Sequence, residues 1–418
     1  MEKHTARITH YWCIIIVLAI ITPLLSVICL FPSVCDWYTE HIYIHIANIV
    51  GRFYGLFPFA IGELMMYLGI LLLILGIAFL TLLIFLRKKQ KYRNFCVKYF
   101  KALLMIGLGV IFTYVITWLI PICGTVLGKD NTSKRTDFTP QEVTALYVYI
   151  INGINDAADE IEITDDNKIQ FYDNDALLPK ISDAMRNVSD EFPRLSGYYP
   201  PVKTAFCSDI LDIMGIGGYT YPFTMEVTRN KYVSPAELPC LISHEFSHHK
   251  GFYKENEANF ISQIALSESC DPILRFSGYE NMRYYAEKEY YNAMDLWWKQ
   301  MEQQGIAKPL PELHQNMTDE EKKQLKNAIS ERNQIFYQYF GTVPEISERA
   351  EKIKNISNNI CLEEYQADSH PINDMPAVNQ VIDEASDFGW EAQADILQEN
   401  NYNGVFLLLM QYFDGILY

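Results

Sequence analysis

Residues 234–260 read SPAELPCLISHEFSHHKGFYKENEANF. Ile242 and Phe246 recur at a helical interval, so the first half of this stretch is predicted to form a helix. Gly251 stands where that helix would end, because glycine readily adopts the left-handed conformation that follows many helix C-termini. A second helix is predicted to begin near Lys254. The stretch therefore predicts two consecutive helices joined by a tight reversal.

The first of these helices contains His244-Glu245-Phe246-Ser247-His248, an HExxH pattern. Two histidines four residues apart lie on one helix face, so both imidazoles can approach one ion at about 2.0 to 2.1 Å. Glu245 lies one residue round from His244, close enough to touch a water on the metal without binding the metal itself. We expect a Zn²⁺ cofactor with His244 and His248 as ligands and Glu245 as the catalytic general base.

Catalytic zinc needs a third protein ligand and an open fourth position. The reversal at Gly251 would bring Glu255 or Glu257 of the second helix back toward the histidines. If no metal binds, both glutamates would instead be solvated on a surface helix. His249 is expected to lie off the ligand face, either packed or exposed. His41 and His45 share the four-residue spacing, but no glutamate follows His41, so no second site is predicted there.

The first third of the chain has a different character. Apolar stretches at residues 11–31, 59–86 and 102–122 each reach the roughly 20 residues that a helix needs to cross a bilayer. We predict three transmembrane helices in residues 1–122. A cleaved signal peptide is the alternative for the first stretch, since Lys3 and Arg7 precede it, although no clear cleavage site follows.

The basic residues predict the orientation of these helices. The loop at residues 36–58 has Arg52 as its only lysine or arginine. The segment between the second and third stretches has no acidic residue and seven basic ones: Arg87, Lys88, Lys89, Lys91, Arg93, Lys98 and Lys101. Because positively charged loops stay in the cytoplasm, the N-terminus should be inside and everything after residue 122 outside. The sequence predicts a multi-pass cell-membrane protein with the lipid bilayer as a partner.

Charge and cysteine content exclude other classes of protein. The chain has 34 basic and 51 acidic residues, a net charge of -17, and the basic segment just described makes the remainder more acidic still. Such a surface repels phosphate backbones, so no nucleic-acid partner is expected. The nine cysteines have irregular spacing and no CxxC pair, which argues against a cysteine zinc site. Cys240 and Cys270 remain a conceivable disulfide pair that the spacing does not favour.

After a polar linker at residues 123–138, a domain is predicted over residues 139–418. Thr139 and Glu142 form a capping-box pattern that predicts a helix start, and Thr318 with Glu321 predicts another. Residues 218–230, GYTYPFTMEVTRN, predict one or two strands.

Within that strand pattern, Pro222 indicates an edge position. The aromatic residues of 281–304 are best explained as a helix packing face. The apolar end of the chain, FLLLMQYF at residues 406–413, is too short to span a bilayer and predicts a core helix. The expected fold is mainly α with a small β-sheet, a zincin-like α+β domain following three transmembrane helices.

The string HEFSHHKGFYKENEANF, preceded by GYTYPFTMEV, resembles the DUF3810 family of bacterial membrane proteins, as does GRFYGLFPFAIGEL before the second apolar stretch. The resemblance is strongest from about residue 203 to 261 and weak after about 304. It also extends to gluzincin-type metallopeptidases, in which a similar EAN or EAD segment supplies the third zinc ligand. The resemblance therefore implies that Glu257, rather than Glu255, is the third metal ligand.

Together these features predict a membrane-anchored zinc metallopeptidase that acts on a peptide or protein substrate outside the cytoplasm. Zinc would lower the pKa of its water toward about 7, and Glu245 would take the proton and return it to the leaving amine. An intramembrane protease is disfavoured because Lys250, Lys254 and several acids surround the motif. The alternatives left open are a zinc protein with a structural, sensing or binding role and no peptidase activity, and a tethered protein without metal. The oligomeric state is also left open.

Overall fold

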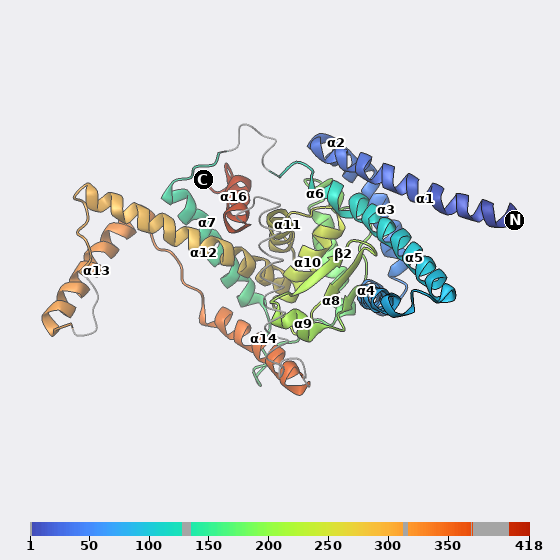
Figure 1. Ribbon diagram of the computed structural model, residues 1–418. Helices are drawn as coiled ribbons and strands as arrows, with labels where there is room; N and C mark the ends of the chain where they lie inside the picture. The colour runs from blue at the N-terminus through green and yellow to red at the C-terminus, as the bar shows by residue number, and fades with distance from the viewer. Residues whose placement is uncertain (1, 128–134, 312–316, 369, 371–400) are drawn as a thin grey trace.

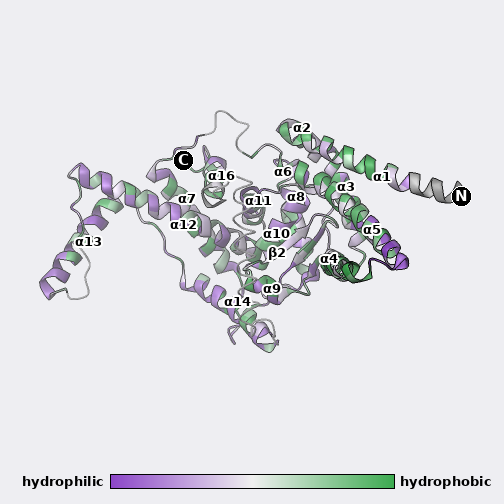
Figure 2. Cartoon of the chain, viewed as in Figure 1, coloured by the Kyte–Doolittle hydropathy of each residue, from purple (hydrophilic) through white to green (hydrophobic). Residues whose placement is uncertain are grey.

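The structure of the protein, a computed structural model, describes residues 2–127, 135–311, 317–368, 370 and 401–418. Residues 128–134, in the middle of the predicted linker 123–138, lie outside this described part. Figure 1 shows long helices extending from one side of a larger, mostly helical domain that carries a small sheet. In Figure 2 the extended helices are largely apolar, whereas hydrophilic and hydrophobic residues alternate along the helices of the larger domain.

The three predicted apolar stretches form helices long and apolar enough to cross a membrane: His10–Leu30, Ile61–Leu86 and Gln90–Ile122. The third begins before the predicted residue 102, because residues 90–101 contain no glycine or proline that would interrupt a helix. The elements of this region are α1 (Glu2–Ser26), η1 (Val27–Leu30), α4 (Ile61–Leu86), α5 (Gln90–Tyr114), η3 (Val115–Leu119) and α6 (Ile120–Ile122). The prediction of three candidate spans is confirmed.

Two contacts far apart on the helices show how they are aligned. The Tyr11 hydroxyl donates to the Lys101 carbonyl (2.8 Å), and Cys29 at the other end of the first span lies 3.8 Å from the Leu119 carbonyl. The first and third spans are therefore parallel. α4 is joined to α5 by a short turn and is antiparallel to it. Consequently the end of the first span, the start of the second and the end of the third gather on one side, next to the larger domain (Figure 1).

The segment between the first two spans is helical, although its sequence was expected to be a loop. It consists of α2 (Pro32–Tyr38), a π-helical turn η2 (Thr39–Tyr43) and α3 (Ile44–Tyr54). One face of it is buried against the larger domain and includes Tyr43, Ala47 and Gly51. Alanine and glycine at four-residue intervals let the helix approach its neighbour closely, which local sequence patterns do not reveal.

The larger domain contains most of the helices. They are α7 (Pro140–Glu160), α8 (Asn174–Asn187), η4 (Pro193–Leu195), α9 (Ser208–Ile213), α10 (Leu238–His249), α11 (Glu255–Ser267), α12 (Pro272–Gln303), α13 (Asp319–Phe340), α14 (Glu348–Ala367) and α16 (Asn401–Phe413). Both predicted capping boxes are present, at Thr139 before α7 and at Thr318 before α13. The predicted short C-terminal helix is also present, as α16.

Three short strands form the sheet in the order β1-β3-β2: β1 (Val202–Thr204), β2 (Gly218–Tyr221) and β3 (Glu226–Arg229). β1 is parallel to β3, with Val202 opposite Val227, and β2 is antiparallel to β3. The predicted strands at residues 218–230 are confirmed, and β2 lies at an edge of the sheet. β1 was not predicted, because three residues carry too little alternation to identify a strand.

The main core lies where α7, α10, α11 and α12 meet. Ile150 and Ile154 of α7 are fully buried there, as are Phe246 of α10 and Ile261 of α11. This packing holds α10 and α11 against each other and so fixes the surroundings of the HExxH residues. All nine cysteines lie in the described part of the chain and are free thiols.

The aromatic face predicted on α12 serves two purposes. Tyr290 stacks on Tyr147 with ring centroids 4.2 Å apart, and Trp297 is buried, so these residues pack as expected. Tyr284 and Tyr291 are instead 58% and 59% exposed, and they line a cavity next to α10. The packing explanation therefore holds for only one side of this helix.

Candidate metal centre

Helix α10 places His244 and His248 one turn apart, with their ring centroids separated by 4.5 Å. The helix ends at His249, and Gly251 follows with a φ of 88°, a left-handed conformation that suits glycine. α11 then begins at Glu255, with Lys254 as its N-cap. The predicted helix, reversal and second helix are all present at the predicted positions.

Hydrogen bonds fix the orientation of both imidazoles. His244 Nδ1 lies 3.0 Å from Asn259 Oδ1 of α11, and His248 Nδ1 lies 2.8 Å from the Phe252 carbonyl oxygen. Since a carbonyl oxygen can only accept, each Nδ1 carries the hydrogen, and in a neutral ring the lone pair is then on Nε2. This arrangement is typical of histidines that bind metals through Nε2.

The two Nε2 atoms face one carboxylate. His244 Nε2 is 3.2 Å from Glu255 Oε2, and His248 Nε2 is 3.7 Å from Glu255 Oε1. One ligand atom from each of the three residues lies within 4.8 Å of the others. Lone pairs and a carboxylate directed at one point repel each other unless a proton or a cation lies between them.

The spacing and chemistry of this group fit zinc. Two ligand atoms on a tetrahedral zinc with bonds of about 2.0 to 2.2 Å lie about 3.4 Å apart, close to the two distances observed. Two imidazoles and one carboxylate are a ligand set that zinc enzymes use, with the fourth position left for water or substrate. His244, His248 and Glu255 are therefore the residues that would hold the ion.

Glu257, the third ligand implied by the resemblance, lies elsewhere. Its carboxylate accepts a hydrogen bond from the Leu127 amide (2.8 Å) and is 3.8 Å from Lys254 Nζ. Burial raises its pKa above the usual range. Two residues along a helix correspond to a rotation of about 200°, so Glu255 and Glu257 point to opposite sides of α11. The structure thus corrects the expected placement: Glu255, and not Glu257, faces the two histidines.

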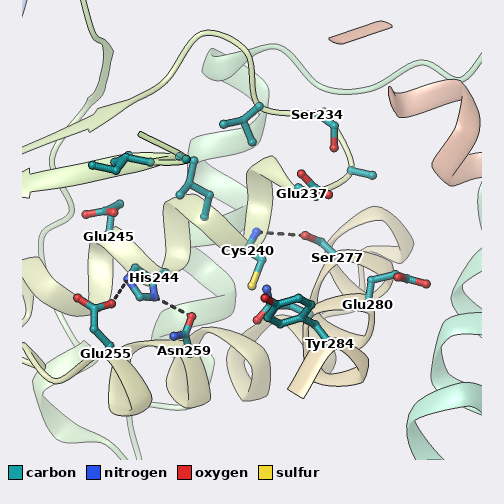
Figure 3. Close-up of a pocket in the computed structure, with 18 of the residues that line it drawn as sticks. Ser234, Glu237, Cys240, His244, Glu245, Glu255, Asn259, Ser277, Glu280 and Tyr284 are labelled. Atoms are coloured by element: carbon teal, nitrogen blue, oxygen red, sulfur yellow. Dashed lines mark hydrogen bonds and ion pairs between the residues drawn. The ribbon is translucent and has the colours of Figure 1, made fainter. Parts of the chain in front are cut away.

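A signal for this correction was present in the sequence. Glu255 and Asn259 are four residues apart and share one face of α11. In the structure this face meets α10, where Glu255 faces both Nε2 atoms and Asn259 holds His244 Nδ1. Figure 3 shows Glu255 and Asn259 on either side of the His244 ring.

Glu245 is directed into the same site but is not one of the three convergent residues. It is 4% exposed, and Thr220 of β2 places its hydroxyl 2.9 Å from Glu245 Oε2. Burial is the main reason that the pKa of Glu245 rises to about 7. In Figure 3 the Glu245 side chain lies above that of Glu255, on the same side of His244. Glu245 thus lies beside the three convergent residues rather than among them.

The other histidine of the motif region is structural. His249 is fully buried, and its Nδ1 lies 3.2 Å from the Met225 carbonyl oxygen. Burial, followed by the nearby Lys250 charge, lowers the pKa of His249 to about 3, so the ring is neutral. It packs off the ligand face, as expected from its position on the helix.

A cavity of about 1380 Å³ opens over the three convergent residues. Its walls come from β2, α10 and α12, and they include side chains that the sequence patterns did not assign to a site: Trp118, Glu237, Glu280, Arg283, Tyr284 and Tyr291. These residues are up to 173 positions apart in the chain, so only folding brings them together. The cavity is large enough to hold several residues of a peptide.

Comparison with protein families gives a match over most of the chain. The model described as "Protein of unknown function (DUF3810)" matches residues 38–351, more than half of the chain. The chain belongs to the DUF3810 family. The match spans the segment before the second apolar helix, the sheet and the HExxH helix, which are the regions of the resemblance noted in the sequence. No curated protein and no solved structure matches the chain.

Proposed function

We propose that this DUF3810 protein is a membrane-anchored zinc metallopeptidase that hydrolyses peptide bonds outside the cytoplasm. One observation carries the proposal: two imidazoles, each held through Nδ1, direct Nε2 toward the carboxylate of Glu255, with the buried Glu245 beside them. The donor set is gluzincin-like, two histidines of an HExxH helix and a glutamate of a following helix. A structural zinc site would have four protein ligands, whereas only three converge among the described residues.

The roles of the residues follow from their positions. Bound zinc would supply Lewis acidity and make an attacking water acidic at neutral pH. Glu245 takes a proton from that water and returns it to the leaving nitrogen. The Thr220 hydroxyl, 2.9 Å from Glu245 Oε2, holds this carboxylate in position. Asn259 and the Phe252 carbonyl keep the His244 and His248 rings oriented.

The edge strand β2 (Gly218–Tyr221) supports a polypeptide substrate. Among the described residues β2 pairs with β3 along one side only, and its residues line the cavity above His244. A strand edge of this kind has free amide and carbonyl groups that can pair with an extended peptide. The side chains of the substrate would then alternate between the cavity and the solvent.

The location outside the cytoplasm rests on the basic segment at residues 87–101. That segment lies at the start of the third span, at the end of the helices away from the larger domain (Figure 1). Since basic loops remain in the cytoplasm, we infer that the larger domain lies on the opposite side of the membrane.

The test compares wild type with Glu245→Gln in the purified full-length chain. We expect both to bind about one zinc per chain, and Glu245→Gln to hydrolyse a peptide library at least about a hundredfold more slowly. Removal of zinc by a chelator should abolish hydrolysis by the wild type. Glu320→Gln, an exposed acid on α13, is the matched control and should keep full activity.

Two results would contradict the proposal. Zinc bound by both proteins without hydrolysis of any peptide would favour a structural, sensing or binding role for the site. An active Glu245→Gln variant would exclude this residue as the general base.

A further inference from the structure

The cavity over the metal centre is in direct contact with the membrane-spanning helices. Trp118, which belongs to the span Gln90–Ile122 and is four residues from its end, lines the cavity. Its ring packs edge-on against Tyr253 (6.3 Å between centroids), and Tyr253 stacks on His248 (5.8 Å). A candidate metal ligand is thus separated from a transmembrane helix by a single aromatic ring.

The edge strand β2 ends at another span. Tyr221, its last residue, packs so closely on Gly62 that a Cβ atom there would collide with the tyrosine ring. The amides of Ile61 and Gly62, which begin α4, donate to the Glu226 carboxylate of β3 (3.0 and 2.7 Å). The strand that would bind substrate is therefore attached to the outer end of the second span.

The segment α2–α3 places this arrangement relative to the lipid. On its inner side the Tyr43 hydroxyl lies 3.3 Å from the His248 carbonyl oxygen and 3.1 Å from that of His249. On its outer side Trp37, Ile49 and Phe53 are between 54% and 70% exposed, and Leu56, which follows α3 in the chain, is 79% exposed.

This outer face lies between the first and second spans in the chain, and the segment also carries the exposed polar residues Glu40, His41 and His45. It is suited to the headgroup boundary of the bilayer, where aromatic and aliphatic side chains are favoured. With its other face on α10, the segment would hold the metal centre at the membrane surface.

We propose that the substrate of this site is a polypeptide anchored in the same bilayer and cut within a few residues of its anchor. The inference rests on the peptidase function proposed above. Hydrolysis consumes one water: its hydroxyl joins the carbonyl carbon, its proton goes to the amide nitrogen, and the C–N bond breaks. The anchored part keeps one new terminus at the membrane, and the remainder is released into solution.

The test uses the full-length chain in liposomes with one peptide sequence presented in three ways. The peptide is soluble, or lipid-anchored through a three-residue spacer, or lipid-anchored through a flexible spacer of 30 residues. A three-residue spacer reaches at most about 10 Å from the bilayer, whereas the flexible spacer reaches about 30 Å on average. Both anchored peptides have the same surface density on the liposome. A difference between their cleavage rates therefore reports the distance of the cavity from the bilayer, and not the higher local concentration that anchoring produces.

We expect the short-spacer peptide to be cut at least about threefold faster than the long-spacer peptide, because a short spacer keeps the cleavage site at the same distance from the bilayer as the cavity. Glu245→Gln liposomes give the background. If the short-spacer peptide resists cleavage while the other two are cut, the inference is overturned and the peptidase function stands. If none of the three is cut by the zinc-loaded chain, the peptidase function fails and the inference fails with it.

A pair of variants tests whether the outer face of α3 sets the distance between the cavity and the bilayer. Ile49→Glu puts a charge on the outer face of α3, 70% exposed, and should lower the short-to-long ratio while leaving soluble-peptide cleavage unchanged. Leu296→Glu makes the same change at a 60% exposed position on α12, far along the chain from the spans, and should keep the ratio. Equal ratios of short-spacer to long-spacer cleavage in the two variants would show that the outer face of α3 does not set the distance between the cavity and the bilayer.

Discussion

Glu255 and Glu257 show how strongly the role of a residue depends on its position around a helix. Both are acids in the first turn of α11, and a motif comparison alone favours Glu257. Glu255 faces the two Nε2 atoms, whereas Glu257 is turned toward the chain at Leu127 and is almost fully buried. A difference of about 200° around the helix thus separates a candidate metal ligand from a structural acid.

Substitution of each glutamate by glutamine distinguishes these roles. Glu255→Gln should lower zinc affinity by more than about a hundredfold, since even residues that only support ligands contribute 10- to 100-fold. Glu257→Gln should keep zinc, because burial already favours the uncharged acid and an amide oxygen can still accept the Leu127 hydrogen bond. Zinc content after dialysis against a competing chelator measures both. Loss of zinc in Glu257→Gln but not in Glu255→Gln would restore Glu257 as the ligand.

At the scale of elements, helix α7 has a strongly defined beginning. The Glu142 carboxylate accepts hydrogen bonds from the Thr139 amide (2.7 Å) and from two nitrogens of Arg135 (2.8 and 2.9 Å). The Arg135 guanidinium is the main reason that the pKa of Glu142 falls to about 2. α7 packs against α12 in the main core, so the stability of its first turn matters to the whole domain.

This pKa predicts a specific dependence of stability on pH. A carboxylate with a lowered folded-state pKa stabilises the fold fully above its unfolded value of about 4.3, and this stabilisation is lost as pH falls toward 2. Wild type should therefore be more stable than Glu142→Gln at pH 6, and the difference should shrink steadily between about pH 4.3 and 2. Urea unfolding followed by circular dichroism measures it. Glu320→Gln, which removes an exposed acid of α13, is the control variant. A constant difference for Glu142→Gln would exclude the mechanism.

At the scale of the whole molecule, a buried ion pair joins the sheet to the membrane helices. Lys203 of β1 pairs with Glu226 of β3, and their side chains are 4% and 2% exposed. Lys203 Nζ also donates to the carbonyls of Tyr54 and Phe59 (both 2.9 Å), while Glu226 accepts from the start of α4. The pair thus holds the connection between α3 and α4 against the larger domain.

Breaking this pair should be costly. Lys203→Met leaves the Glu226 carboxylate buried without its cation, and we expect a loss of about 3 to 5 kcal/mol in the free energy of unfolding. Lys299→Met removes a lysine from an exposed pair with Asp295 and should leave the stability almost unchanged, because exposed ion pairs contribute little. Denaturant unfolding of both variants in the same detergent makes the comparison. Similar small losses would mean that the buried pair does not hold the two regions together.

Local patterns in the sequence were sufficient for the features that depend on neighbours along the chain. Three apolar runs determine three candidate spans, the capping boxes at Thr139 and Thr318 determine two helix starts, and Gly251 determines the end of the HExxH helix. Each of these depends on hydrophobic burial or hydrogen bonding within a few residues.

Tertiary structure decided the features that depend on residues distant in sequence. Which glutamate meets the histidines is set by the packing of α11 on α10, and the three-residue strand β1 exists because β3 pairs with it. Trp118 reaches the cavity only because the third span ends beside α10. These outcomes follow from contacts between segments brought together by folding, so no window of sequence contains the forces that produce them.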